Sequence, residues 1–293
     1  MNAGAVRRVT AAVIASVATP VARGLLDHQP PGGQARWTRL NHAGEPVSML
    51  AGPAVAAGLL AGTAAAPSPR AAAAFAVAVT SGAAFGVADD LFEDTSSRDK
   101  GLRGHLRALA HGRVSTGGLK VLGIGAGGLL AAALAPPPAG EGPRRGWSGV
   151  GDVLTSGAVI AATANLVNLF DLRPGRALKV VALAAAPLAV AGGAGAPAAA
   201  ALLGAGWSTV EADLGEVDML GDGGANALGA ALGTAVVLGA PRGVRLAWLT
   251  VVLALTVASE RVSFGAVIER TPVLRELDAW GRRPVAPPGA GRR

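Results

Sequence analysis

The chain has 293 residues, of which 51% are hydrophobic and only 15% are charged, and its mean hydropathy is +0.44. The apolar residues form long uncharged blocks, which is typical of a protein with several membrane spans and argues against an ordinary soluble domain. The net charge of +7 does not indicate nucleic-acid binding, because the basic residues lie mostly between the apolar blocks and aromatic residues make up only 3% of the chain. The chain has no cysteine, which excludes disulfide bonds and thiolate metal sites.

The apolar blocks predict an all-α, polytopic membrane bundle of about nine to ten transmembrane helices. The first block, residues 9–22, follows Arg7 and Arg8. This pattern fits either a cleaved signal peptide or a retained first span. We favour the retained span, because no clean small-x-small cleavage site follows before Arg23. The next spans are expected at residues 46–66, 71–88, 121–134 and 153–170.

Residues 180–210 form a single uncharged run. As one helix it would be about 46 Å long, which is too much for a hydrocarbon core of about 30 Å. Glycines and a proline at residues 192–197 interrupt the run, so we expect a hairpin of two short spans. Spans at residues 225–239 and 246–259 follow. We expect one transmembrane domain over residues 1–264 and a basic cytoplasmic tail over residues 265–293, disordered at its end.

An aspartate pair, Asp89 and Asp90, ends the uncharged run that begins at Ala71. Eighteen uncharged residues span about 27 Å as a helix, so the pair is expected where a span leaves the bilayer. Adjacent carboxylates repel one another, which suggests a bound cation, although a solvated helix end would also explain an isolated pair. The segment that follows, residues 98–120, is rich in Lys and Arg, which places this face in the cytoplasm. Within it, residues 102–110 are predicted to form a short interfacial helix.

Other polar motifs are expected at the same membrane face. Two spans separate Asp90 from Asn168, and two more separate Asp171 from Asp222 if the long uncharged run is a hairpin. Counting backwards, the loop that contains His42 lies on this face as well. Carboxylates from separate elements can bind Mg²⁺ together with phosphate oxygens, and the glycines after Asp222 let the backbone approach a phosphate closely. The sequence therefore predicts a Mg²⁺-dependent site for a diphosphate at the membrane surface.

Four motifs then occur in a characteristic order. They are His42-x-Gly44-x-Pro46, Phe85-Gly86-x-x-Asp89-Asp90, Asn165-x-x-Asn168-x-x-Asp171 and Met219-Leu220-Gly221-Asp222-Gly223-Gly224. Together they resemble the motifs of the polyprenyl-phosphate N-acetylhexosamine-1-phosphate transferases, the family that includes phospho-N-acetylmuramoyl-pentapeptide transferase. The resemblance covers about residues 36–222.

The resemblance implies an enzyme of the plasma membrane with its active site on the cytoplasmic face. It would transfer a sugar-1-phosphate from a UDP-sugar to a polyprenyl phosphate and release UMP, which begins a lipid-linked cell-envelope glycan. By position, Asp222 would be the main ligand of Mg²⁺, or of Mn²⁺ in its place, together with Asp90. Asp89 and Asp90 would be the catalytic pair beside the metal and the lipid phosphate. The implied substrate-binding residues are His42, Asn165, Asn168 and Asp171.

The implied partners are UDP-sugar, polyprenyl phosphate, membrane lipid and a second copy of the chain in a homodimer, with no nucleic acid. The chain also departs from the family pattern: Pro174 stands where the family has a second aspartate, Ala225 replaces a serine, and residues 260–264 replace a His-rich motif. These departures motivate an alternative, a catalytically degenerate protein that acts as a membrane partner or binds the lipid carrier in envelope assembly. A small-solute transporter is a third interpretation, but its acidic groups would be expected at the midplane. Lys120, at the start of a span, is interpreted as a snorkelling anchor.

Overall fold

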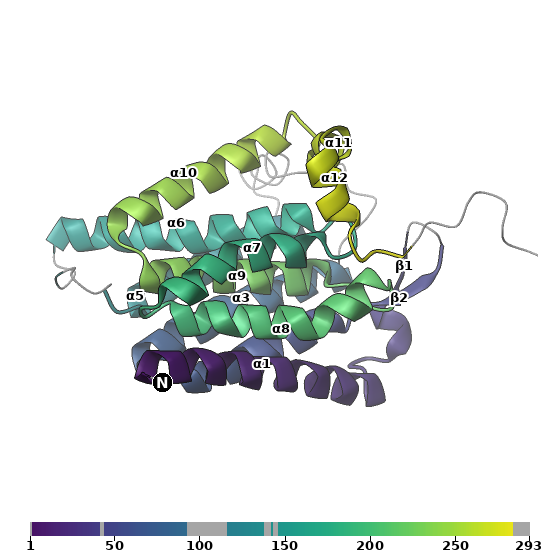
Figure 1. The fold of residues 1–293 in the computed structure, drawn as a ribbon, viewed down its shortest axis with the longest axis horizontal. Helices are drawn as coiled ribbons and strands as arrows, with labels where there is room; N and C mark the ends of the chain where they lie inside the picture. Colours follow the sequence, from purple (N-terminus) through teal and green to yellow (C-terminus); the bar gives the residue numbers. More distant parts are fainter. Residues whose placement is uncertain (1, 42–43, 93–115, 138–141, 143–145, 284–293) are drawn as a thin grey trace, which may run out of the picture.

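The computed structural model describes residues 2–41, 44–92, 116–137, 142 and 146–283. Most of them belong to helices that lie side by side in one bundle (Figure 1). The helices are α1 (Ala3–His28), α2 (Ala51–Gly62), α3 (Pro69–Phe92), α5 (Thr116–Leu134), α6 (Gly146–Phe170), α7 (Arg176–Ala191), α8 (Ala196–Leu214), α9 (Gly221–Gly239), α10 (Arg242–Ser259), α11 (Phe264–Arg270) and α12 (Pro272–Ala279). The shorter elements are the 3₁₀ helices η1 (Gln34–Trp37) and η2 (Thr63–Ala65) and the strands β1 (Thr38–Leu40) and β2 (Pro46–Ser48). The expected all-α class is confirmed, with one small β-hairpin added.

Five helices among the described residues are long and apolar enough to cross a membrane, namely α1, α3, α5, α6 and α10. This finding supports a membrane protein. The expected span over residues 46–66 begins at the wrong residue, because Pro46–Ser48 is a strand that pairs with β1. The helix α2 begins only at Ala51 and has 12 residues. Alone, a helix of that length rises about 18 Å, short of a bilayer core of about 30 Å, and η2 extends it by one further turn.

The long uncharged run is broken where the sequence predicted. α7 ends at Ala191 and α8 begins at Ala196. Gly192 and Gly193 between them have φ of 82° and 80°, a left-handed conformation that glycine adopts without strain and that reverses the chain. The expected interfacial helix at residues 102–110, the residue His42 and the end of the tail lie outside the described residues.

The centre of the bundle is α9 (Figure 1). All of its residues are buried except Asp222 and Gly239. Helices α2, α3, α6, α7 and α8 pack around it, and α3 and α6 make the most extensive contacts. α9 is rich in glycine and alanine, whose small side chains let helix backbones approach one another closely, as membrane bundles require.

The contact between α3 and α9 is made through two glycines of α3, one turn apart. A Cβ atom at Gly82 would lie 2.7 Å from the carbonyl oxygen of Asn226, and one at Gly86 would lie 2.3 Å from the carbonyl oxygen of Asp222. The two backbones therefore touch. Residues three and four positions after Gly86 share its face of the helix, so this packing brings the aspartate pair to the start of α9.

Replacement of Gly86 by alanine tests this packing. We expect G86A to destabilise the protein by about 1–3 kcal/mol, because the new methyl group meets backbone atoms of Asp222 and Gly223 that cannot rotate away. Thermal unfolding in detergent, followed by tryptophan fluorescence, measures the effect. The control is G125A in α5, where nothing lies within 4 Å of the added carbon. Equal stability of the two variants would contradict the close approach of α3 to α9.

Candidate functional site

The carboxylate of Asp90 caps the start of α9 from a neighbouring helix. Its Oδ1 accepts a hydrogen bond of 3.0 Å from the backbone N–H of Asp222, and its Oδ2 accepts one of 2.9 Å from the N–H of Gly223. α9 has no side-chain cap of its own, so Asp90 supplies the acceptor that a helix N-terminus needs and stands in its favourable dipole field. Gly221 has φ of 59°, and a Cβ there would lie 2.9 Å from Oδ2 of Asp90, so the motif requires glycine at this position.

Lys120, in the first turns of α5, lies between the other two aspartates. Its Nζ is 2.8 Å from Oδ2 of Asp89, and it also forms a short contact with Oδ2 of Asp222. The interpretation of Lys120 as a snorkelling anchor is wrong, because its ammonium is paired with two carboxylates inside the bundle. A charged residue just inside a span, at the same face as unpaired carboxylates, is the sequence signal that could have identified this pairing.

The site meets some of the requirements of a divalent cation. Asp89 and Asp222 already converge on one positive charge, that of Lys120, and Oδ1 of Asp89 and Oδ1 of Asn168 are buried with no hydrogen-bond partner among the described residues. Buried oxygens of this kind normally have a donor or a cation beside them. Asp90 fits the role of ligand less well, because both of its oxygens are bound to the backbone of α9. Among the described residues, no group of three or more acidic or histidine side chains is arranged to hold a metal ion.

A cavity of about 450 Å³ opens beside Asp90. Its wall carries several carboxylates and two guanidinium groups, and the charged residues that line it include Arg39, Asp90, Asp171, Arg173, Asp213 and Asp218. We call it the acidic cavity. Its carboxylates can accept hydrogen bonds from hydroxyl and N–H groups of a polar ligand, and its arginines can bind phosphate.

Asp171 lies in the loop that joins α6 to α7 and faces this cavity. Burial raises the pKa of its carboxyl well above the usual value, and the nearby charges of Asp213, Asp222 and Asp90 raise it further. Asp213, near the end of α8, is itself buried and accepts a hydrogen bond of 2.6 Å from the backbone N–H of Gly175. The loop is thus held by an acidic residue that sequence reasoning did not single out.

The β-hairpin forms another part of the cavity wall. Arg39 donates a hydrogen bond of 2.6 Å from its Nη2 to the carbonyl oxygen of Asp90. Ser48 accepts a bond of 2.8 Å from the N–H of Met219 and so fixes the stretch that leads into α9. Arg23 of α1 binds both carboxylate oxygens of Asp218 at 2.8–3.0 Å. The roles of Arg23, Arg39 and Ser48 are not evident from the sequence, because their contacts join segments far apart in the chain.

A smaller apolar groove of about 180 Å³ lies on the other side of Lys120. It is enclosed by α5, α6, α9 and α10, and the residues that line it include Lys120, Val121, Ile124, Asn165, Asn226 and Leu253. Asn165 therefore faces the apolar groove, whereas Asp171, from the same motif, faces the acidic cavity. The groove is suited to an apolar chain whose polar end reaches the ammonium of Lys120.

At this end of the bundle the structure brings together four of the expected residues, Asp89, Asp90, Asp171 and Asp222. Asn168 lies in α6 with its amide oxygen buried, and Asn165 points into the groove. His42 lies outside the described residues, although its neighbour Asn41 lines the acidic cavity. No protein-family model and no curated protein matches this chain. Its function is therefore inferred from the site itself.

Removal of the Lys120 charge is expected to destabilise the fold. K120M leaves Asp89 and Asp222 facing each other without a counter-charge, which we expect to cost about 3 kcal/mol, at the low end for a buried pair because Asp222 is partly exposed. Thermal unfolding in detergent measures the loss. K120R, which keeps the charge, is the matched control, and D89N/K120M should recover part of the stability. A K120M protein as stable as wild type would contradict the bridging role.

The raised pKa of Asp171 predicts a gain of stability when its carboxyl is replaced, in contrast to the loss expected for Lys120. A carboxyl whose pKa is raised in the folded state lowers the free energy of unfolding as the pH rises above the unfolded value of about 4. We therefore expect D171N to be more stable than wild type at pH 7 to 8, with the gain fading as the pH falls towards 4. Unfolding temperatures of both proteins across this range give the answer. A gain that grows at low pH would contradict the raised pKa.

Proposed function

We propose that the protein is a membrane phosphoglycosyl transferase, which moves a sugar-1-phosphate from a UDP-sugar to a polyprenyl phosphate. The observation that carries the proposal is that linked charged residues border two unlike cavities: Asp90 lines the acidic cavity, Lys120 lines the apolar groove, and Asp222 contacts both residues. The acidic cavity suits a polar nucleotide sugar, and the apolar groove suits a prenyl chain. A reaction that joins a water-soluble donor to a lipid acceptor needs this arrangement at the membrane edge. The order of the sequence motifs adds independent support.

The proposal includes a bundle of about nine crossings. In addition to the five long apolar helices, α7, α8 and α9 lie alongside them in the bundle (Figure 1). We count α2 with η2 as a short crossing, because together they reach from one end of the bundle to the other. At one end a Cβ at Gly52 would meet the backbone of Gly224, and at the other end the carbonyl oxygen of Ala66 accepts a hydrogen bond from Arg7. Among the described residues, most Lys and Arg lie at the aspartate end of the helices, which supports a cytoplasmic location for that end.

The proposed reaction is a single displacement at phosphorus. An oxygen of the prenyl phosphate attacks the β-phosphorus of the UDP-sugar, a new P–O bond forms, and the bond from that phosphorus to the bridging oxygen breaks, so that UMP leaves. Lys120 would stabilise phosphate oxygens in this step, whereas the first N–H groups of α9 are already bound to Asp90. Asp89, whose Oδ1 has no hydrogen-bond partner in the part of the chain that the structure describes, is the better placed of the pair to accept a proton from the attacking phosphate.

Two of the three aspartates at the start of α9 also fit a role as ligands of a divalent cation. Asp222 and Asp89 would hold Mg²⁺ or Mn²⁺, with phosphate oxygens completing its coordination, and the ion would neutralise charge on the leaving phosphate. Asp90 has a different task in this scheme, since it fixes the start of α9 and therefore the direction of Asp222. Asp171 and Asp213 would accept hydrogen bonds from the donor's hydroxyl or N–H groups, and Arg39 and Arg173 would bind its phosphates.

A second candidate function is a lipid-carrier-binding protein without turnover. It is favoured by the ammonium of Lys120 between Asp89 and Asp222, and by Pro174 in the loop of the acidic cavity. Purified protein that binds undecaprenyl phosphate but releases no UMP from a panel of UDP-sugars would identify this function. Release of UMP that depends on Mg²⁺ and on the prenyl phosphate would identify the transferase.

The substitution D222N tests the transferase directly. We expect UMP release from UDP-N-acetylglucosamine and undecaprenyl phosphate to fall by about 100-fold or more, because the variant removes a charge at the point where the phosphates meet. The matched control is E211Q, which removes an exposed acidic group near the end of α8, at the same end of the bundle as Asp222. Full activity in D222N would exclude a metal or electrostatic role for Asp222.

A further inference from the structure

The C-terminal part of the chain returns to the wall of the acidic cavity. α11 and α12 lie across the end of the bundle, next to the ends of α6 and α7 (Figure 1). The ring of Phe264, the first residue of α11, stacks on Phe170, the last residue of α6, with 4.7 Å between ring centroids. Residues 271–283, which contain α12 and the short stretch after it, then pass over the 171–175 loop. We call residues 271–283 the C-terminal strap.

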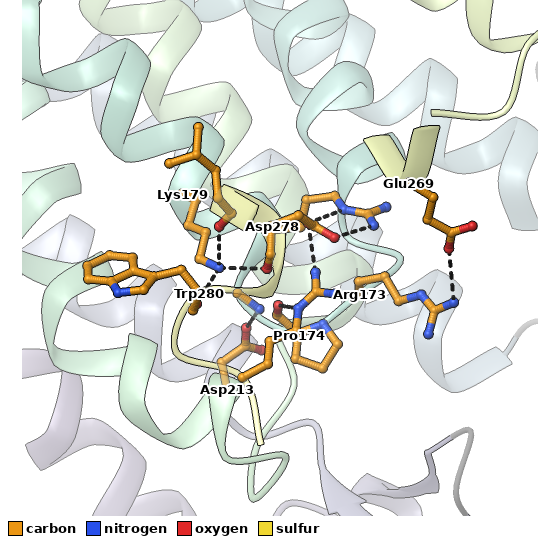
Figure 2. A network of polar contacts seen from close by, with 11 residues as sticks. Arg173, Pro174, Lys179, Asp213, Glu269, Asp278 and Trp280 are labelled. Atoms are coloured by element: carbon orange, nitrogen blue, oxygen red, sulfur yellow. Dashed lines mark hydrogen bonds and ion pairs between the residues drawn. The ribbon is translucent and has the colours of Figure 1, made fainter. Parts of the chain in front are cut away.

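Asp278 is the central residue of the strap (Figure 2). Arg176, the first residue of α7, donates to both carboxylate oxygens of Asp278 at 2.7 and 2.9 Å, and Arg282 donates a third bond at 2.7 Å. Burial alone would raise the pKa of Asp278, but the two guanidinium groups hold it below its usual value. The carboxylate is thus ionised at neutral pH, and Arg176, which is only 4% exposed, depends on it for its counter-charge.

Lys179, one turn further along α7, fixes the end of α12. Its ammonium donates to the carbonyl oxygens of Leu277, Asp278 and Trp280 at 3.0, 2.8 and 2.6 Å, as Figure 2 shows. Carbonyl groups at the end of a helix have no partners within the helix, and a cation is their preferred neighbour. The first turn of α7 therefore holds the strap by both a carboxylate and a helix terminus.

The strap in turn holds the 171–175 loop. Arg282 donates a bond of 2.9 Å from its Nε to the carbonyl oxygen of Pro174, while Asp213 accepts from the N–H of Gly175 on the other side (Figure 2). Arg283 reaches Glu45, in the turn of the β-hairpin, at 3.1 Å. The strap thus links two walls of the acidic cavity, the loop and the hairpin, neither of which has a regular helix to keep it in place.

We propose that the C-terminal strap fixes the 171–175 wall of the acidic cavity and so sets the affinity of the site for its nucleotide-sugar donor, with Asp278 as the positioning residue. The identity of the ligand rests on the proposed function, whereas the fixing of the loop does not. Asp278 contacts Arg176 and Arg282 rather than the cavity, so it acts through the loop, whose residues Asp171, Arg173 and Pro174 line the cavity. Loss of the strap should weaken the binding of the donor and leave the binding of the lipid acceptor, on the side of the apolar groove, unchanged.

The test compares D278N with E276Q. Both variants remove one negative charge from α12, but Glu276 is exposed and Asp278 is the residue bound by Arg176. Each protein is studied as the full chain in lipid nanodiscs. We expect backbone hydrogen exchange at residues 171–176 to rise by about tenfold in D278N and to stay at the wild-type rate in E276Q. The KM for UDP-N-acetylglucosamine should rise several-fold in D278N, with kcat and the KM for undecaprenyl phosphate near wild type.

Each outcome decides the proposal. Unchanged exchange in D278N would overturn the fixing of the loop. Raised exchange with an unchanged KM for the donor would overturn the positioning role, and a fall in kcat alone would do the same. Should wild-type protein release no UMP, the transferase proposal fails, and the exchange measurement alone decides whether the strap fixes the loop. If D278N does not fold, R282Q replaces it, because it removes the bond to Pro174 and leaves Arg176 paired with Asp278.

Discussion

The contact between the backbones of α3 and α9 is the constraint on which the rest of the structure depends. Membrane helices gain little from apolar burial against one another, so their packing relies on close approach through small residues. Gly82 and Gly86 provide that approach, and their face of α3 continues directly into the aspartate pair. As a result, the carboxylate of Asp90 reaches the unpaired N–H groups at the start of α9, and Asp89 comes to face Asp222 across the ammonium of Lys120.

This arrangement places several carboxylates close together at one end of the helix bundle, where buried unpaired charges are costly. Two of the costs are offset within the site: Asp90 is stabilised by the dipole of α9, and Asp89 and Asp222 share Lys120. At Asp171, burial raises the pKa and the charges of its acidic neighbours raise it further. Groups whose ionisation is made unfavourable by the fold are concentrated at functional sites, since a ligand can supply the missing partner. The acidic cavity is thus the part of the site that gains most from a bound polar ligand.

Much of this site follows from the sequence, because the direction of successive helices decides which motifs share a face. The aspartate pair, Asp171 and Asp222 come together as that reasoning predicted. Hydropathy could not separate β2 from α2, because a short strand and a half-length helix look like one apolar block. It also could not assign Lys120, whose partners lie on two other helices. Asn165 lies within α6, whereas Asp171 lies in the loop that begins after Phe170, so the two residues face different cavities.

The most direct measurement of the central claim is a cross-link between α3 and α9 in the membrane. The chain has no native cysteine, so a V87C/G223C variant gives an unambiguous signal. A Cβ at Gly223 would lie 2.5 Å from Cγ2 of Val87, which leaves the two Cβ atoms close to the spacing of a disulfide once valine is replaced. Rapid formation of the disulfide under mild oxidation, with none in V87C/G125C, is the predicted result. If no disulfide forms, α3 and α9 do not touch, and the account of the site is contradicted.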